Sequence, residues 1–150
     1  MNIIMYIAID PGKTGGISVL DNTCSDFIYP MPDTEQKIMK LLRGWQTNAK
    51  AIIEAQHAFP GMGAKAQWSF AQHYGFIRGC LVSLGIPFTE VSPQKWMAYF
   101  GFKRLKDEDK KKHKTRILQK AQNLYPQSTV NLQTADSLML CEYLRLTDRS

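Results

Sequence analysis

A run of apolar residues at positions 3–9 ends at an acidic residue, Asp10, which is followed by Pro11 and Gly12. An apolar run of this length before a turn-forming pair predicts a strand buried on both faces of a sheet. A carboxylate at the end of such a strand is costly unless a cation or hydrogen bonds compensate it. Taken alone, Asp10 is explained equally well as a cap on the following turn through Gly12 or Lys13.

The rest of the chain predicts an alternation of strands and helices within a single domain, residues 1–150. After the first strand we expect strands at 16–20, 23–29, 51–54 and 86–91. We expect helices at 34–43, capped by Asp33 or Thr34, and at 65–84, 93–99, 114–124 and 134–144, with Thr134 as the last cap. Residues 103–113 read as a charged loop. A hairpin followed by alternating elements predicts an α/β fold: a five-stranded mixed sheet with helices on both faces.

Composition narrows the classes of function. A net charge of +6 favours a polyanionic partner, because cationic side chains release counterions condensed on phosphates. The three cysteines are far apart, without a CxxC pair, which argues against a disulfide framework or a structural zinc site and favours a reducing cytoplasm. No signal peptide and no apolar run long enough for a membrane span is visible, so no membrane association is expected.

Two further acids occupy positions where the pattern predicts burial. Glu54 ends the fourth predicted strand and shares a face with Ile52, although it could instead lie past the sheet edge in solvent. Asp136 begins the last predicted helix on the face that should pack on the sheet, the face of Met139, Leu140 and Tyr143. Its alternative reading is a first-turn carboxylate favoured by the helix dipole.

Together the three acids predict a metal site. Asp10 and Glu54 can lie on neighbouring strands, and Asp136 can reach both from a covering helix. Carboxylates this close repel one another unless a cation holds them, and hard oxygen ligands select Mg²⁺, with Mn²⁺ as a substitute. Two such ions can activate water and stabilise the leaving oxygen of a phosphodiester. The sequence therefore predicts metal-assisted phosphodiester hydrolysis.

Four segments in order resemble the motifs of RuvC-like Holliday-junction resolvases, in particular their phage-type branch. Residues 6–16 resemble the opening "IDPG…GG" strand, and residues 53–63 with Ser69 and Phe70 resemble the second acidic motif and its glycine-containing loop. Residues 91–96 resemble the "P…W" segment. Residues 112–114 and 134–138 resemble the basic helix and the closing "AD-A/S-L" motif. The resemblance spans nearly the whole chain.

The resemblance implies a ribonuclease H-like fold, a homodimer, paired nicks in four-way DNA junctions and, for a phage protein, a location in the host cytoplasm. It implies Asp10, Glu54 and Asp136 as metal ligands, and Lys95 and Lys114 as the cations nearest the scissile phosphate. One departure stands out: these resolvases carry a fourth acid three or four residues before the last, where this chain has Gln133 and Leu132. A weak neutral ligand at Gln133, altered metal preference or a purely binding role therefore remains open.

A basic tract supplies the expected DNA surface. Residues 95–120 contain ten Lys and Arg but only three acids. Such a tract is usually a solvated charge run, but its position beside the last acidic motif favours phosphate contact. Phe59, in a Gly/Pro loop, is a candidate for stacking on an unpaired base, or else packs under its own loop. The predicted DNA-binding residues are Lys13, Phe59, Lys65, Lys103, Arg104, Lys110, Lys111, Lys112 and Arg116.

The same residues suggest other functions. Gly12-Lys13-Thr14 resembles the tail of a P-loop, but such a loop needs a glycine where this chain has Ile7. The phosphate loop of actin-like kinases requires two domains. A non-catalytic junction-binding protein and a nuclease of broader specificity for flaps or forks remain alternatives. The predicted helix 65–84 carries the candidate dimer stripe, Phe70, Tyr74, Ile77 and Leu81, whose alternative is packing on the sheet.

Overall fold

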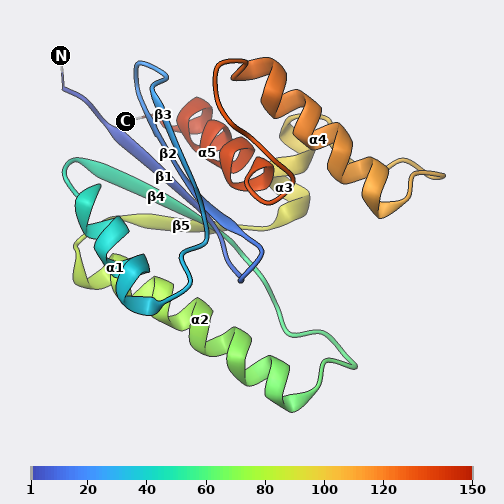
Figure 1. Ribbon diagram of the computed structural model, residues 1–150, viewed down its shortest axis with the longest axis horizontal. Helices are drawn as coiled ribbons and strands as arrows, with labels where there is room; N and C mark the ends of the chain where they lie inside the picture. Colours follow the sequence, from blue (N-terminus) through green and yellow to red (C-terminus); the bar gives the residue numbers. More distant parts are fainter. Residues whose placement is uncertain (1, 150) are drawn as a thin grey trace.

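The computed structural model describes residues 2–149, and its central feature is one five-stranded sheet between two layers of helices (Figure 1). The strands are β1 (Met5–Asp10), β2 (Gly16–Asp21), β3 (Asp26–Pro30), β4 (Ala49–Glu54) and β5 (Phe88–Val91). The helices are α1 (Glu35–Gly44), α2 (Ala64–Ser83), α3 (Pro93–Tyr99), α4 (Lys110–Leu124) and α5 (Ala135–Thr147). The predicted five-stranded α/β class is confirmed.

The sheet is mixed, with strand order β3-β2-β1-β4-β5. The β1–β2 and β2–β3 pairs are antiparallel, as expected for consecutive strands joined by short turns, whereas β1–β4 and β4–β5 are parallel. Strand β1 is therefore central, as its apolar run predicted. Because β1, β4 and β5 run in the same direction, their carboxyl ends lie at one edge of the sheet.

Each face of the sheet is covered by its own apolar cluster. On one face Tyr6, Ala8 and Ile52 pack against α3, α4 and α5 through residues such as Trp96 and Leu138. On the other face the alternate strand residues pack against α1 and α2; these include Ile7, Ile9, Ile53, Ile38, Leu42, Ile77 and Leu81. The alternation of side chains along a strand thus decides which helix layer each strand residue meets.

The structure corrects several predicted boundaries. Helix α4 begins at Lys110 rather than at 114, because Asp109 accepts a hydrogen bond from the backbone of Lys112 at 2.7 Å and caps the helix. Strand β3 begins at Asp26 rather than at 23, since Asp21 binds the backbone N–H groups of Thr23 and Ser25 and holds them in a turn. Strand β5 is also shorter than predicted, and α5 runs on to Thr147.

Helix α5 begins after Thr134, as predicted, but no side chain caps it there. Thr134 occupies the N-cap position, but its side chain caps no helix N–H. Instead, the Oδ1 atom of Asn131 accepts from the backbone of Gln133 at 2.9 Å and of Thr134 at 3.2 Å. Asparagine is a preferred residue for this kind of local side-chain to backbone bond.

The two halves of helix α2 lie in different environments. Ile77 and Leu81 are fully buried against the sheet, so the predicted dimer stripe is wrong for its C-terminal half, which packs as core. The N-terminal half extends beyond the sheet (Figure 1), and Trp68 there is 69% exposed. Within the described residues, no helix is long and apolar enough to cross a bilayer.

Candidate active site at the carboxyl edge of the sheet

Two of the predicted carboxylates are brought together by strand register. Ile9 of β1 pairs with Ile53 of β4, so the next residues, Asp10 and Glu54, end adjacent strands side by side. Each lies two residues after a strand residue that packs against the α5 layer: Asp10 after Ala8, and Glu54 after Ile52. The two side chains therefore point to the same face of the sheet, the face that α5 covers. Glu54 is 8% exposed, which excludes the solvated alternative for this residue.

The third carboxylate is brought in by a close approach of α5 to the sheet. Ser137 shares a 2.8 Å hydrogen bond with Ser18 of β2, and both residues are fully buried. A Cβ atom on the neighbouring Gly16 would lie only 3.1 Å from the Ser137 hydroxyl, so the absence of a side chain there permits this contact. Asp136, in the first turn of α5, lies close enough to the ends of β1 and β4 for its charge to act on Asp10 and Glu54.

The electrostatics show that the three carboxylates interact. Burial raises the pKa of Asp10 to about 8, and the negative charges of Glu54 and Asp136 add to this effect. Burial also raises the pKa of Glu54 to about 7, although the bond from Trp96 works in the opposite direction. The pKa of Asp136 is raised by burial as well. Buried carboxyls that raise one another's pKa in this way are a typical feature of functional sites.

One cation balances the cluster, the ammonium of Lys114 on α4. Its positive charge lowers the pKa of all three carboxyls, and that of His113 acts in the same direction on Asp136. Lys95, the other predicted cation, is exposed on α3. Of the two lysines that the resemblance placed beside the scissile phosphate, it is Lys114 whose charge acts on the whole cluster.

The three carboxylates do not form a preformed metal cage. Among residues 2–149, no group of three or more Asp, Glu, His or Cys side chains is already placed so that together they could hold a metal ion. This is compatible with Mg²⁺, which keeps several of its waters and is usually bound by one or two protein carboxylates together with substrate phosphates. The three side chains would offer only carboxylate oxygens, without sulfur or imidazole, and such donors fit Mg²⁺ or Mn²⁺.

Glu54 is held by a residue whose part in the site the sequence did not reveal. The indole Nε1–H of Trp96 donates to Oε2 of Glu54 at 2.8 Å, and Trp96 is fully buried. The register explains this contact: Glu54 pairs with Val91, the last residue of β5, and α3 begins at Pro93. Trp96 lies in the core and also fixes one oxygen of a site carboxylate. A tryptophan shortly after a strand is by itself an ordinary core signal.

The turn after Asp10 is fastened by residues from other elements. The backbone N–H of Gly12 donates to Nε2 of His73 on α2 at 2.9 Å, so this amide is not capped by Asp10. Gly12 has a φ of 114°, which favours glycine. A Cβ atom on Gly15 would overlap the carbonyl oxygen of Asp10. The capping alternative for Asp10 therefore fails at Gly12, and His73, to which the sequence assigned no role, orders this turn.

The position expected to carry a fourth acid has a different task here. The amide nitrogen of Gln133 donates to the carbonyl oxygen of Gly15 at 3.2 Å and approaches that of Lys13 at 3.5 Å. It thereby ties the start of α5 to the turn between β1 and β2. Leu132 is 48% exposed. Gln133 thus stabilises the turn that follows Asp10.

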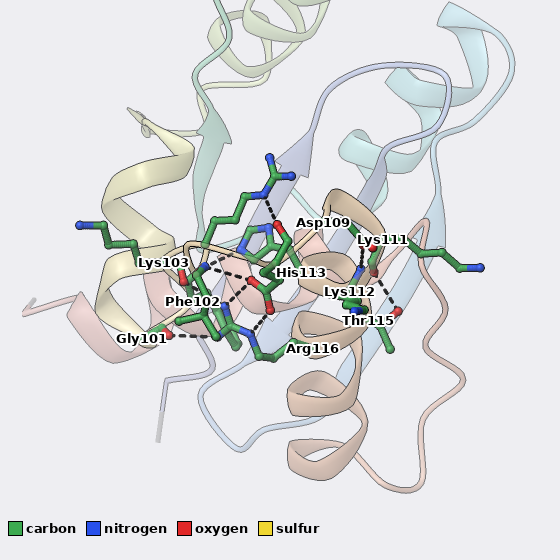
Figure 2. Close-up of polar contacts among 12 residues, drawn as sticks. Gly101, Phe102, Lys103, Asp109, Lys111, Lys112, His113, Thr115 and Arg116 are labelled. Carbon is green, nitrogen blue, oxygen red and sulfur yellow. Dashed lines mark hydrogen bonds and ion pairs between the residues drawn. The ribbon is translucent and has the colours of Figure 1, made fainter.

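The basic tract divides into exposed cations and one structural arginine. The exposed members are Lys95, Lys103, Arg104, Lys106, Lys110, Lys111, Lys112, Lys114 and Lys120. Arg116 instead donates from Nε and Nη2 to both Glu108 oxygens, at 2.9 and 3.0 Å, and to the carbonyls of Gly101 and Lys103 (Figure 2). The guanidinium of Arg116 is engaged in holding the segment before α4 rather than turned to solvent.

The remaining predicted DNA-binding residues lie in segments that follow the carboxyl ends of β1 and β4. Lys13 is exposed in the turn between β1 and β2, and Lys65 is exposed in the first turn of α2. Phe59 lies in the loop between β4 and α2 with 58% of its surface exposed, so it does not pack under its own loop. The stacking of Phe59 on an unpaired base stays a prediction.

Comparison with solved structures shows a shared fold. The model matches Thermus thermophilus RuvC in complex with a Holliday-junction substrate with a TM-score of 0.64 at 12% identity, over 96% of both chains. It matches a second T. thermophilus RuvC structure with a TM-score of 0.59 at 12% identity, over 93% of this chain and 92% of the other. No family model and no curated protein matches the sequence. The chain therefore has the fold of RuvC, an α/β fold of the ribonuclease H-like type.

Proposed function

We propose that this protein is a metal-dependent endonuclease that resolves four-way DNA junctions or other branched DNA by phosphodiester hydrolysis. The observation that carries the proposal is the convergence of Asp10, Glu54 and Asp136 from β1, β4 and α5, balanced by Lys114. An apolar sheet gains nothing in stability from three mutually repelling acids. Their arrangement is accounted for by a bound cation and a polyanionic substrate.

Asp10, Glu54 and Asp136 would hold the metal, Mg²⁺ with Mn²⁺ as a substitute, and two ions in all. When bound, such ions would supply water activation and charge neutralisation for phosphodiester hydrolysis. Trp96 orients Glu54 through its 2.8 Å bond, and Gln133 fixes the turn behind Asp10. Lys114, assisted by Lys95, offsets the negative charge that develops on the phosphate.

The DNA lies across the carboxyl edge of the sheet, between α2 and α4. Exposed cations on both sides meet its backbone, and Phe59 stacks on an unpaired base at the branch point. Three of the cations, Lys110 to Lys112, occupy the first turn of α4, where the helix dipole disfavours positive charge. Their placement is thus explained by phosphate binding rather than by helix stability. A homodimer would present two such sites for paired nicks. The phage-type branch and a cytoplasmic location stay predictions.

The test is cleavage of a labelled synthetic four-way junction with Mg²⁺, Mn²⁺ or EDTA. Wild type is expected to make paired nicks with either metal and none with EDTA. Asp10→Asn is expected to lose at least about two orders of magnitude in rate while still binding the junction. The matched control is Asp33→Asn, a change of an exposed aspartate on the α1 side of the molecule, which should cut like wild type.

A second candidate is a branched-DNA-binding protein without cleavage, because Gln133 replaces the fourth acid of the resolvases that the sequence resembles. Tight binding to the junction with no cut under either metal would establish it and overturn the catalytic proposal. A panel that adds flaps, forks and plain duplex separates a resolvase from a nuclease of broader specificity. Equal cleavage of flaps and junctions would identify the latter.

A further inference from the structure

A cavity of about 490 Å³ lies beside the carboxylate cluster, on the other side of α3. Helix α3 separates the two: Trp96 faces Glu54, whereas Gln94, Met97 and Ala98 line the cavity. Phe102 and the start of α4 complete it. The full lining is Pro93, Gln94, Met97, Ala98, Phe102, Lys103, Arg104 and His113.

The chemistry of the lining is divided between an apolar floor and a cationic rim. Pro93, Met97, Ala98 and Phe102 present carbon surface, while Lys103 and Arg104 supply positive charge at the opening. The volume lies within the range of pockets that take small organic ligands. An apolar slot rimmed by cations complements a group that joins a flat, weakly polar ring to a phosphate, which is the composition of a nucleotide.

The rim is held in place before any ligand binds (Figure 2). Arg116 donates to the carbonyls of Gly101 at 3.2 Å and of Lys103 at 2.9 Å, and the ring of His113 contacts the carbonyl of Phe102 at 2.6 Å. Arg104 donates from Nε to the carbonyl of Glu108 at 2.9 Å. A site with a preformed rim avoids part of the ordering cost of binding.

The cavity adjoins the proposed position of the cleaved phosphate. His113 lines it and also acts on Asp136 by its charge, and the next residue is Lys114. A DNA strand with one phosphate at the carboxylates therefore passes over the rim with a nearby nucleotide. We propose that this cavity receives an unpaired base of that strand, while Lys103 and Arg104 bind the phosphate that flanks it. This inference rests on the proposed function and specifies how the protein recognises its DNA substrate.

The test fills the cavity without touching the carboxylates. Ala98 is exposed on α3, so Ala98→Phe occupies the cavity without removing a core residue. The matched control is Ser83→Phe, a change of an exposed residue at the C-terminal end of α2. Binding is measured without divalent metal, on a four-way junction and on a series in which one nucleotide after another near the branch point is abasic.

Wild type and Ser83→Phe are expected to bind about tenfold more weakly when one particular base is missing, since stacking and burial of one base contribute about that factor. Ala98→Phe is expected to bind the intact junction about as weakly as wild type binds the abasic junction. Removal of that base should not weaken the binding of Ala98→Phe further. Such coupling between protein and DNA changes identifies direct contact.

Three negative outcomes are distinct. Junction preference over duplex in wild type, with no abasic position whose penalty Ala98→Phe removes, overturns this inference alone. A uniform loss of affinity in Ala98→Phe, with the abasic penalty intact, also overturns it. Equal binding of junction and duplex by wild type, with neither cleaved, removes the proposed function and this inference with it.

Discussion

At the scale of single residues, the carboxylate cluster makes the free energy of unfolding depend on pH. The pKa of Asp10 is about 8 in the folded chain because of burial and its acidic neighbours, against 3.8 as the ordinary value. From about pH 4 upward the unfolded chain loses this proton while the native state retains it. Stability contributed by protonated Asp10 is therefore present at low pH and lost as the pH rises to about 8. Glu54, with a pKa of about 7, acts in the same direction.

Asp10→Asn should consequently raise the melting temperature of the metal-free protein at pH 8 by a few degrees. One kcal/mol corresponds to about 2–4 °C in a chain of this size. At pH 4 the variant should melt close to wild type, because the unfolded wild-type chain then also retains much of its proton at this site. Thermal melts in EDTA across this pH range measure the effect. Asp33→Asn serves as the control, and a gain that is the same at both pH values would contradict the explanation.

Trp96→Phe tests the orientation of Glu54. Phenylalanine retains most of the buried ring but cannot donate, so Oε2 of Glu54 loses its 2.8 Å bond. An unpaired buried acceptor costs about 1–3 kcal/mol. We expect the Mg²⁺ concentration needed for half of the metal-induced rise in melting temperature to increase several-fold. Trp68→Phe, at a residue 69% exposed, is the control.

A lower melting temperature of Trp96→Phe with an unchanged Mg²⁺ midpoint would show that Trp96 serves packing only.

The same residue marks a limit of what can be predicted from the sequence. Burial of Trp96 is predictable from its apolar neighbours, whereas the partner of its N–H depends on the register of β4 with β5, which the sequence does not display. The burial of the three acids was predictable, because Asp10 and Glu54 end apolar strands and Asp136 begins a helix on its apolar face.

At the scale of elements, α4 combines a site cation with a positively charged first turn. A triple change of Lys110, Lys111 and Lys112 to Gln should reduce the slope of log affinity for junction DNA against log salt by about 0.9 for each phosphate that is no longer neutralised. The helix itself should become no less stable, since positive charges oppose the dipole at its N-terminus. Titrations at several salt concentrations measure the slope. Lys40→Gln on α1 is the control, and an unchanged slope would exclude this turn from the DNA surface.

Arg116 has a different task in the same helix. Removing its guanidinium in Arg116→Gln releases the carbonyls of Gly101 and Lys103 and the carboxylate of Glu108. We expect trypsin to cut more rapidly after Lys103, Arg104 or Lys106 in this variant than in Lys112→Gln. Equal rates of cleavage in the two variants would show that Arg116 does not hold the segment.

The start of α4 also shows why element boundaries escaped prediction. Residues 103–113 carry charges without an apolar stripe, which is typical of a loop, yet Asp109 caps a helix that starts at Lys110. The apolar stripe appears only where α4 reaches the sheet, at Ile117 and Ala121. Hydrophobic periodicity reports packing, so a helical turn that projects past the core leaves no periodic signal.

At the scale of the whole molecule, the part of α2 beyond the sheet is our candidate for the surface that contacts a second copy of the chain. Trp68 is 69% exposed there, and Phe70 and Tyr74 are stacked with ring centroids 6.1 Å apart. If the proposed homodimer forms through this half, Trp68→Asp should shift the sedimentation of the protein from dimer to monomer. Val82→Asp, at a residue 70% exposed in the C-terminal half, should leave it dimeric. Dimers of both variants would place the interface elsewhere.

Helix α5 is the last element of the chain, yet it lies on the first two strands. Its Ser137 bonds to Ser18 and its Cys141 donates to the carbonyl of Tyr6 at 3.1 Å, contacts that span more than a hundred residues of sequence. During synthesis the first three strands leave the ribosome long before the residue that completes the carboxylate cluster. Any product of premature termination before Asp136 lacks one of its three acids. The order of the elements thus makes an unfinished chain incapable of assembling the site.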